Sequence, residues 1–416
     1  MKRIIIVGGG FAGLRLGREL KNTDYEVWMF DKNNFHQFQP LFYQVATGGL
    51  EPSSISFPLR KVYQKHKNCH VRMAEVLEVE YEKNIIKTNI GDFAYDYLVI
   101  AIGATTNFFG NAAIEQNAIP MKSVSEALYL RNRILLNFEK TLSASPEEKK
   151  ALLNVVVVGG GATGVEVSGA LSEMRTYILP KDFPEIDFKQ MNIYLIEGSS
   201  KTLGSMSEVA SQKSREYLEK LGIKVMTNTQ VKNYDGESVE LGNGEIIKTR
   251  TVIWGAGVIG NKIKGLPENS VVKGNRLQVN EYNLVEGTQN VYAIGDIAFM
   301  KEGEYQHGHP QVATVAIDQG KHLAKNFRNM LKNKPSEPFR YKNKGSLATV
   351  GRHLAVADLP SIKFQGSLAW IFWMFLHLML VLGVKNRLLI FVNWLWKYFT
   401  YDQSLRLIIK PFKKPL

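Results

Sequence analysis

The sequence predicts an α/β fold with two Rossmann-like domains, each built on a buried parallel sheet, followed by an apolar C-terminal region. A strand, a glycine turn and a helix start occur twice, about 150 residues apart, at 4–18 and at 155–171. The strands of both repeats are unbroken runs of β-branched residues, which is typical of strands covered by helices on both faces. The C-terminal region is predicted because the chain becomes strongly apolar after a polar break at 332–338.

Composition narrows the possible classes of protein. The chain has 416 residues, 45% of them hydrophobic, which suffices for two packed domains and an additional element. Its formal net charge of +13 indicates an anionic neighbour, either nucleic acid or a membrane surface. The single cysteine, Cys69, excludes an internal disulfide and a redox centre made from a cysteine pair. Residues 1–7 are interpreted as the first strand, because their apolar run is too short for a signal peptide.

The first glycine turn, Gly8-x-Gly10-x-x-Gly13, follows a predicted strand and opens a helix. The first glycine of such a turn allows a tight bend, the second lets the backbone approach a pyrophosphate, and the third lets helix and strand pack closely. The pyrophosphate binds to the N–H groups of the helix N-terminus. The next strand, 26–30, ends in Asp31, where a carboxylate can bind a ribose hydroxyl. These features predict a dinucleotide site, and an ordinary glycine turn is the alternative.

A later strand, at 290–294, ends in Gly295 and Asp296. A carboxylate at this point can hold a ribityl hydroxyl, while the helix that follows faces a flavin. FAD occupies a longer groove than NAD and needs such a remote second contact. Together with the N-terminal glycine turn, this pair therefore predicts FAD at the first site.

The second glycine turn, Gly159-x-Gly161-x-x-Gly164, is followed by a strand that ends in Glu197. A carboxylate there accepts hydrogen bonds from the adenosine ribose and repels a 2′-phosphate, which favours NADH over NADPH. Lys201 is the nearby cation that could offset this preference. Glu166 is expected in the first turn of the helix, either complementing the helix dipole or orienting the nicotinamide.

The tail contains two apolar stretches, 368–384 and 388–399, and four of the six tryptophans. As one helix, the first stretch would be about 25 Å long, slightly short of a hydrocarbon core of about 30 Å. We predict an interfacial helix whose cations meet anionic lipid, in preference to a single span or a helix buried in a dimer interface. The basic residues that accompany the tryptophans are Lys385, Arg387, Lys397, Arg406, Lys410, Lys413 and Lys414. This clustering favours a membrane over nucleic acid, so no nucleic-acid partner is expected.

Longer motifs resemble those of the type II NADH:quinone oxidoreductases. The loop at 33–48, NNFHQFQPLFYQVATG, is similar to the flavin-proximal loop of that family. Further resemblance lies in Gly164-Val165-Glu166, in WGAGV at 254–258 and in GSLATVGR at 345–352. The tail from 370 to 401 resembles the bacterial long-tail form. The resemblance covers essentially the whole chain, and the loop and tail motifs are more specific than the glycine turns.

The resemblance implies the fold of FAD/NAD-linked reductases such as glutathione reductase, with a C-terminal membrane-attachment region. Family enzymes bind FAD noncovalently, accept a hydride from NADH and reduce a membrane quinone in the respiratory chain without pumping protons. No metal is required. The resemblance places Glu166 near the nicotinamide and Gln44 near the flavin ring. The other cofactor-binding residues expected are Lys32, Val45, Ala101 and Gly103 for FAD and Gly257 for NADH.

The wall of the quinone site is expected at 310–320. Many family members have an Ala-Gln pair followed four residues later by Gln, whereas this chain has Thr314 and Asp318. Either Asp318 takes part in quinone protonation or the amide of Gln311 or Gln319 replaces the missing one. A solvated helix acid is the alternative for Asp318.

The predicted domains are 1–112 with 274–335 for FAD, 113–273 for NADH and 336–416 for membrane attachment. The enzyme is expected on the cytoplasmic face of the inner membrane, peripheral or monotopic, as a homodimer. Two other functions stay open: a soluble reductase that passes electrons to ferredoxin or another acceptor, and a slow-turnover flavin redox sensor.

Overall fold

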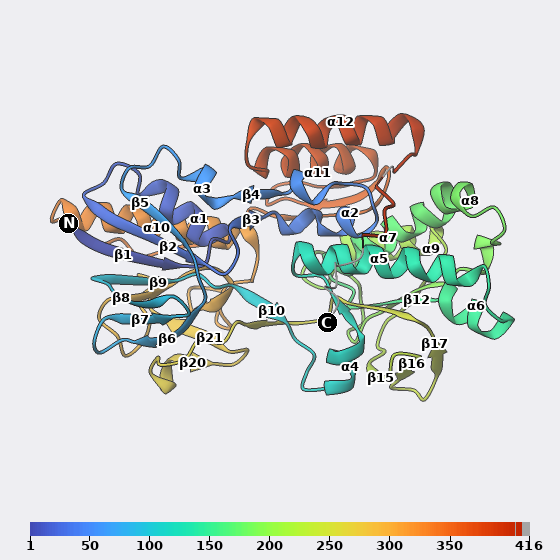
Figure 1. The fold of residues 1–416 in the computed structure, drawn as a ribbon, viewed down its shortest axis with the longest axis horizontal. Coiled ribbons are helices and arrows are strands. Elements are labelled where there is room, and N and C mark those ends of the chain that lie inside the picture. Colours follow the sequence, from blue (N-terminus) through green and yellow to red (C-terminus); the bar gives the residue numbers. More distant parts are fainter. Residues whose placement is uncertain (404, 410–416) are drawn as a thin grey trace, which may run out of the picture. The chain divides into compact units, whose positions relative to one another are not determined.

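The computed structural model describes residues 1–403 and 405–409 and divides into two compact units (Figure 1). Unit 1 consists of Met1–Gln37, Ser56–Thr105 and Val258–Asn343. Unit 2 consists of Phe38–Ile55, Thr106–Gly257 and Lys344–Leu416. The predicted tail cations Lys410, Lys413 and Lys414 lie outside the described residues.

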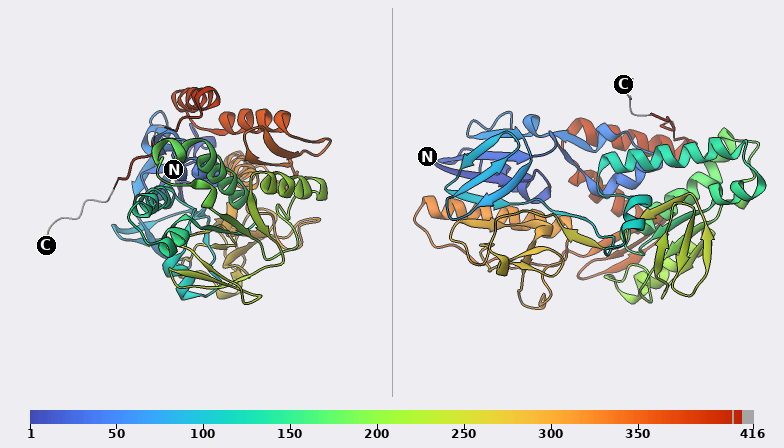
Figure 2. Two further views of the ribbon diagram at one scale, coloured as in Figure 1. Left: turned by 90° about the vertical axis from the view of Figure 1, so that its right-hand side faces the viewer. Right: turned by 60° about the horizontal axis from the view of Figure 1, so that its bottom comes forward.

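Unit 1 contains a five-stranded parallel sheet with the strand order β22-β9-β1-β2-β5. Its strands are β1 (Lys2–Val7), β2 (Tyr25–Asp31), β5 (Cys69–Met73), β9 (Tyr97–Ile100) and β22 (Val291–Ala293). Ile4, Ile5 and Ile6 of β1 are fully buried, as the β-branched run predicts for a strand covered on both faces. Helix α1 (Phe11–Glu19) follows β1 and packs on α10 (Ala313–Leu331), the orange helix beside the blue strands in Figure 2.

Short strands and one short helix complete unit 1. They are β3 (Phe35–Gln37) with β4 (Ser56–Pro58), α3 (Leu59–Val62), β6 (Val76–Glu80), β7 (Ile85–Thr88), β8 (Gly91–Ala94), β20 (Val271–Val272), β21 (Arg276–Val279) and β23 (Ala298–Met300), the last of which pairs in parallel with β21. Strands β10 (Ala104–Thr106) and β19 (Val258–Gly260) lie where the chain passes from one unit to the other.

Unit 2 contains a second parallel sheet of five strands, in the order β11-β18-β12-β13-β14. Its strands are β11 (Ile119–Pro120), β12 (Val155–Val158), β13 (Ile193–Ile196), β14 (Ile223–Met226) and β18 (Thr251–Trp254). The helices of this part are α4 (Ala112–Asn117), α5 (Val124–Thr141), α6 (Pro146–Leu153), α7 (Ala162–Glu173), α8 (Leu179–Asp182) and α9 (Glu208–Lys220). A three-stranded antiparallel sheet joins them, formed by β15 (Val231–Tyr234), β16 (Ser238–Leu241) and β17 (Ile246–Lys248). The two parallel sheets confirm the predicted fold class.

The C-terminal part of unit 2 packs on α7 and on α2 (Phe42–Ala46). It consists of β24 (Ser346–Gly351), β25 (Leu354–Asp358), β26 (Lys363–Gln365), α11 (Ser367–Leu380) and α12 (Val384–Thr400). Gly169 of α7 permits the approach of β24, since a Cβ at Gly169 would lie 1.5 Å from the carbonyl oxygen of Val350.

The prediction of one helix over 368–384 is wrong. Helix α11 ends at Leu380, and the chain turns at Gly383, whose φ is +77°, before α12 begins. Arg387 stabilises this break, because its guanidinium donates to the carbonyl oxygens of Met379 and Val381 at 2.8 Å each. These are carbonyls that a continuous helix would have satisfied by itself. Over residues 1–403 and 405–409, no helix is both long and apolar enough to cross a membrane.

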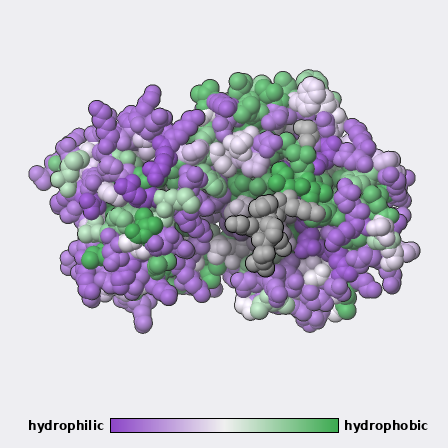
Figure 3. Space-filling model, in the orientation of Figure 1, coloured by the Kyte–Doolittle hydropathy of each residue, from purple (hydrophilic) through white to green (hydrophobic). Residues whose placement is uncertain are grey.

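Each tail helix has one side buried against the rest of unit 2 and one side exposed. Trp373 of α11 and Ile390 of α12 are buried against unit 2. The opposite side is apolar but exposed, and the hydrophobic surface over α12 is visible in Figure 3. Its residues are between 48% and 73% exposed, and they are Leu368, Ile371, Phe375, Leu388, Phe391, Trp396 and Phe399.

The compact units do not follow the predicted domain limits. The tail from Lys344 belongs to the same unit as 106–257, and the loop at 38–55 belongs there too. The predicted ranges were defined by the cofactor that each domain would bind, whereas the two units are defined by packing. The domain assignment therefore stays a prediction.

Candidate functional site

The first glycine turn has the geometry of a phosphate-binding loop. Gly8 has a φ of +107°, and a Cβ there would lie 2.3 Å from the carbonyl oxygen of Ala101. A Cβ at Gly13 would lie 2.0 Å from the oxygen of Gly8. Both positions therefore require glycine, one for the bend and one for the packing of α1 on the turn.

Gly10 differs, because a Cβ at this position would project into open space. It is the N-cap of α1 and, as a glycine, has no side chain with which to cap the N–H groups of the first helical turn. An open approach and uncapped N–H groups at a helix N-terminus fit the pyrophosphate of a dinucleotide.

Asp31 and His36 hold this turn in place. Asp31 accepts hydrogen bonds from the N–H groups of Gly9 at 2.6 Å and Asn33 at 2.7 Å. Burial raises the pKa of Asp31, and these hydrogen bonds oppose the shift. Burial lowers the pKa of His36 to about 4, so its neutral ring donates from Nδ1 to the carbonyl oxygen of Gly9, 2.9 Å away. His36 lies in the loop motif at 33–48, but no feature of the sequence alone predicts this contact.

The second glycine turn repeats the arrangement in unit 2. Gly159 has a φ of +104°, and a Cβ at Gly164 would lie 1.9 Å from its oxygen. Gly161 faces open space at the uncapped start of α7. Glu197 accepts hydrogen bonds from Gly160 at 2.5 Å and from Ser199 at 2.7 Å, as Asp31 does in unit 1.

Lys201 forms an ion pair with Glu208 at 2.8 Å. The cation that could have favoured a 2′-phosphate is therefore already paired. Gly257 ends the segment after β18, with a φ of +71°.

The remaining predicted FAD residues are placed around unit 1, with one exception. Lys32 directly follows β2, and Ala101 and Gly103 follow β9, where Gly103 has a φ of +70°. Val45 is fully buried in α2 and belongs to unit 2.

The predicted quinone residues Gln311, Thr314, Asp318 and Gln319 all belong to unit 1, at the start of α10 and just before it. Gln319 is fully buried and accepts a hydrogen bond from the N–H of Gly295 at 2.7 Å. Gln311 donates to the carbonyl oxygen of Asp296 at 3.0 Å, and the Thr314 hydroxyl lies 3.1 Å from that of Tyr341. Both amides thus hold the turn that was predicted to contact FAD.

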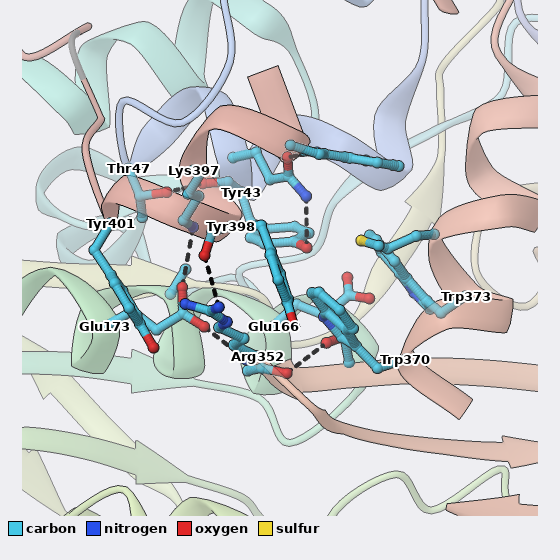
Figure 4. A pocket seen from close by; sticks show the side chains of 16 residues that line it. Tyr43, Thr47, Glu166, Glu173, Arg352, Trp370, Trp373, Lys397, Tyr398 and Tyr401 are labelled. Carbon is cyan, nitrogen blue, oxygen red and sulfur yellow. Dashed lines mark hydrogen bonds and ion pairs between the residues drawn. The ribbon is translucent and has the colours of Figure 1, made fainter. Parts of the chain in front are cut away.

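Unit 2 contains a pocket whose full lining the sequence did not predict (Figure 4). It is formed by α2, α7, the end of β24, α11, α12 and the residue after α12. Its lining residues are Tyr43, Gln44, Thr47, Glu166, Ala170, Glu173, Thr349, Gly351, Arg352, Trp370, Trp373, Met374, Trp394, Lys397, Tyr398 and Tyr401. An aromatic lining with few polar groups is typical of sites for flat organic ligands.

Glu166 is the buried acid of this pocket and is only 8% exposed. It is the fifth residue of α7, so its expected place in the first turn is wrong. Burial beyond the first turn also does not fit an acid that only complements the helix dipole. Burial raises its pKa to about 8, although the backbone N–H of Thr349 and the side chain of Trp373 oppose the shift. Glu166 is therefore mostly a neutral carboxylic acid at pH 7 and can donate a proton.

Gln44 lies in the same pocket, in a short hydrogen-bonded chain. Its amide nitrogen donates to the Tyr43 hydroxyl at 2.9 Å, and the Trp394 indole donates to its amide oxygen at 2.7 Å. Burial raises the pKa of Tyr43 well above 10, so Tyr43 stays a phenol. The structure therefore brings together two predicted residues, Gln44 and Glu166, that are distant in sequence.

The other end of the pocket is charged. Lys397 pairs with Glu173 at 3.0 Å, and the backbone N–H of Arg352 donates to Glu173 at 2.7 Å. None of these residues was predicted as a site residue, although Arg352 is the last residue of the GSLATVGR motif at 345–352. Residues 173, 352 and 397 are far apart in the sequence and share no local motif, so the sequence could not predict that they form a cluster.

Comparison with known proteins identifies the family. The model of the pyridine nucleotide-disulphide oxidoreductases matches residues 2–320, and that of the NDH2 C-terminal domain matches 343–400. The chain is 33% identical, over 408 residues, to the type II NADH:quinone oxidoreductase Ndh of Mycobacterium tuberculosis, covering 94% of this chain and 87% of that protein. It is 28% identical to the type II NADH:quinone oxidoreductase of Staphylococcus saprophyticus, covering 88% of this chain and 92% of that one.

Solved structures agree on the fold. NDH2 from Plasmodium falciparum in complex with NADH superimposes with a TM-score of 0.91 at 24% identity, covering 98% of this chain and all of that one. The sulfide:quinone oxidoreductase of Aquifex aeolicus superimposes with a TM-score of 0.70 at 18% identity, over 98% and 92% of the two chains. The family resemblance and the fold class read from the sequence are both confirmed, and the chain belongs to the type II NADH:quinone oxidoreductases, an FAD-dependent family of flavoproteins.

Proposed function

We propose that this protein oxidises NADH and reduces a membrane quinone, and that the pocket of unit 2 receives the quinone. The proposal rests on one observation: α11 and α12 both line the pocket and expose an apolar surface. Trp370, Trp373, Trp394 and Tyr398 from these helices line the pocket, while other residues of the same two helices expose an apolar surface. An apolar acceptor dissolved in a bilayer could therefore pass from the lipid beside these helices into the pocket.

The dinucleotides are assigned to the two glycine turns. In unit 1, Gly8, Gly10 and Gly13 with Asp31 would hold FAD noncovalently, and the Gly295–Asp296 turn would supply a second contact. When bound, FAD supplies the chemistry that accepts a hydride from NADH and passes electrons on to the quinone.

In unit 2, the turn at Gly159, Gly161 and Gly164 would hold the NADH pyrophosphate. Glu197 already binds the turn through both carboxylate oxygens and would accept the ribose hydroxyl through remaining lone pairs. Its charge, together with the pairing of Lys201 to Glu208, disfavours NADPH.

Glu166 would supply a proton to the quinone. Reduction follows NADH + H⁺ + quinone → NAD⁺ + quinol, so one proton must come from outside the hydride. A buried carboxylic acid with a pKa of about 8 holds such a proton at neutral pH. Gln44, fixed between Tyr43 and Trp394, would help position the ring.

Attachment to a membrane surface is part of the proposal. The exposed apolar side of α11 and α12, together with Lys385 beside it, fits an interfacial position with cations near lipid phosphate. We place the protein on the cytoplasmic face of the inner membrane, as a homodimer that pumps no protons.

Asp318 stays a second candidate for quinone protonation, with Gln311, Thr314 and Gln319 beside it. The variants Glu166→Gln and Asp318→Asn distinguish the two candidates. Replacement of the residue that donates the proton should slow quinone reduction but not the reduction of the flavin by NADH.

The test of the proposed function is NADH oxidation by the purified holoenzyme, followed by the loss of NADH absorbance, with and without a short-chain benzoquinone. Strong stimulation by the quinone, with NADPH as a poor substitute, is expected. Flavin that is reduced by NADH but indifferent to quinone would contradict the proposal and favour a ferredoxin-type acceptor or a redox sensor.

A further inference from the structure

Arg352 occupies an unusual position at the charged end of the pocket. It follows β24, and Figure 4 shows its guanidinium between the rings of Tyr398 and Tyr401. The guanidinium carbon lies 4.2 Å from each ring centroid. One terminal nitrogen, Nη2, donates to the carbonyl oxygen of Tyr398 at 2.6 Å. The two rings cover the faces of the guanidinium and leave its N–H groups to be satisfied in its plane.

Two of these nitrogens have no acceptor in the part of the chain that the structure describes. Nε and Nη1 of Arg352 are buried, and neither makes a hydrogen bond within residues 1–403 and 405–409. Buried donors of a charged group are rarely left unpaired, because the loss of hydration is then uncompensated. An oxygen supplied by a ligand of the pocket would satisfy them.

Glu166 and Arg352 both line the pocket and are connected through helix α7. Glu166 and Glu173 lie on one face of α7, seven residues apart, which corresponds to about 10 Å along a helix. Arg352 is bound to Glu173 through its backbone N–H. Ala170, between the two acids, is small and also lines the pocket. The pocket thus contains a buried proton donor and a guanidinium with two N–H groups that find no acceptor among residues 1–403 and 405–409.

We infer that Arg352 binds one carbonyl oxygen of the quinone while Glu166 serves the oxygen on the opposite side of the ring. The inference rests on the proposed function and adds a residue to the site. A quinone carries two oxygens at opposite ring positions, and a hydrogen bond of about 2.8 Å at each end would bridge a separation of this order. Aromatic side chains such as Trp370 and Tyr398 would flank the ring.

The chemistry favours a charged side chain at this position. Two electrons enter the quinone, and both oxygens become hydroxyls. The hydride of NADH accounts for the two electrons and one of the protons. Glu166 donates the second proton and is protonated again from the solvent. Negative charge that develops on the second oxygen before protonation is stabilised by a guanidinium that stays protonated throughout.

The experiment compares Arg352→Gln with wild type in the full-length holoenzyme. The loss of a charged hydrogen bond predicts a rise in the KM for a short-chain benzoquinone of about 10- to 100-fold. NADH oxidation with ferricyanide, which has no carbonyl oxygen to bind, should keep its rate. Arg352→Lys keeps the charge but loses the planar fork, so its KM should lie between the two. Arg352→Lys also carries the test if the glutamine variant fails to fold.

Arg406→Gln is the matched control. Arg406 also belongs to the chain end, where it pairs with Asp182, but it does not line the pocket. Its quinone KM should match that of wild type. An equal rise in KM for the Arg406 and Arg352 variants would overturn the inference, because both would then act by loosening the chain end. An unchanged KM in Arg352→Gln would overturn it as well while leaving the proposed function intact. A wild-type enzyme that ignores quinone would instead defeat the proposed function, and the inference with it.

Discussion

Replacement of Glu166 by Gln should make the protein more stable at neutral pH while it impairs quinone reduction. Glutamine keeps the shape and the donor capacity of the protonated acid but cannot ionise. In wild type, burial raises the pKa of Glu166 from 4.5 to about 8. The folded state therefore binds this proton over a pH range in which the unfolded chain has released it.

The sign of the effect follows from proton linkage. Below pH 4.5 both states are protonated, and the two proteins should have the same stability. Between pH 4.5 and 8 the folded wild type holds one more proton than the unfolded chain, so its free energy of unfolding falls by about 1.4 kcal/mol per pH unit. At pH 7 the accumulated loss is on the order of 3 kcal/mol, and above pH 8 it reaches a plateau on the order of 5 kcal/mol. Glu166→Gln escapes this loss.

The assay is urea unfolding of both proteins from pH 5 to pH 9, with quinone-dependent NADH oxidation measured on the same samples. The stability difference should widen with pH up to about pH 8, while the rate with quinone drops by about 10²- to 10⁴-fold if Glu166 is the acid. NADH oxidation with ferricyanide provides the control for flavin and NADH binding. Parallel pH profiles for the two proteins would refute the raised pKa, and an unchanged quinone rate would refute the role as proton donor.

Three further changes test other parts of the structure. Gly8→Ala should abolish flavin binding, measured by the absorbance of the purified protein, because a Cβ would lie 2.3 Å from the oxygen of Ala101; full flavin content would contradict the steric reasoning. Glu197→Gln should raise the KM for NADH about tenfold and improve the use of NADPH, since the charge that repels a 2′-phosphate is removed; an unchanged ratio of the two nucleotides would show that Glu197 does not select between them. The double change Leu388→Glu and Phe391→Glu should prevent sedimentation with anionic lipid vesicles but preserve NADH oxidation with ferricyanide, because both side chains are exposed. Vesicle binding at the wild-type level would show that the exposed side of α12 does not attach to lipid.

Much of the nucleotide-binding machinery could be predicted because it depends on residues close together in sequence. Gly8 and Gly13 are required by contacts within one strand-turn-helix unit, and the same holds for Gly159 and Gly164. Asp31 was predictable from its position at the end of the next strand. The structure also shows why prediction failed for the helix at 368–384: Gly383 takes a φ of +77°, and Arg387 satisfies the carbonyls at the break, which apolar periodicity does not reveal.

The sequence by itself determined the fold class, the family and the two glycine turns with their acids, because these follow from local spacing and from motifs spread over the whole chain. Only the tertiary structure decided that Gln311 and Gln319 hold the Gly295–Asp296 turn, and that one pocket unites Gln44, Glu166 and Arg352. The physical reason is that the burial and partners of a side chain are set by elements hundreds of residues away. In the sequence, nothing distinguishes Glu166 from an ordinary acid on a helix. Its pKa is raised because α7, β24 and α11 together exclude water from it.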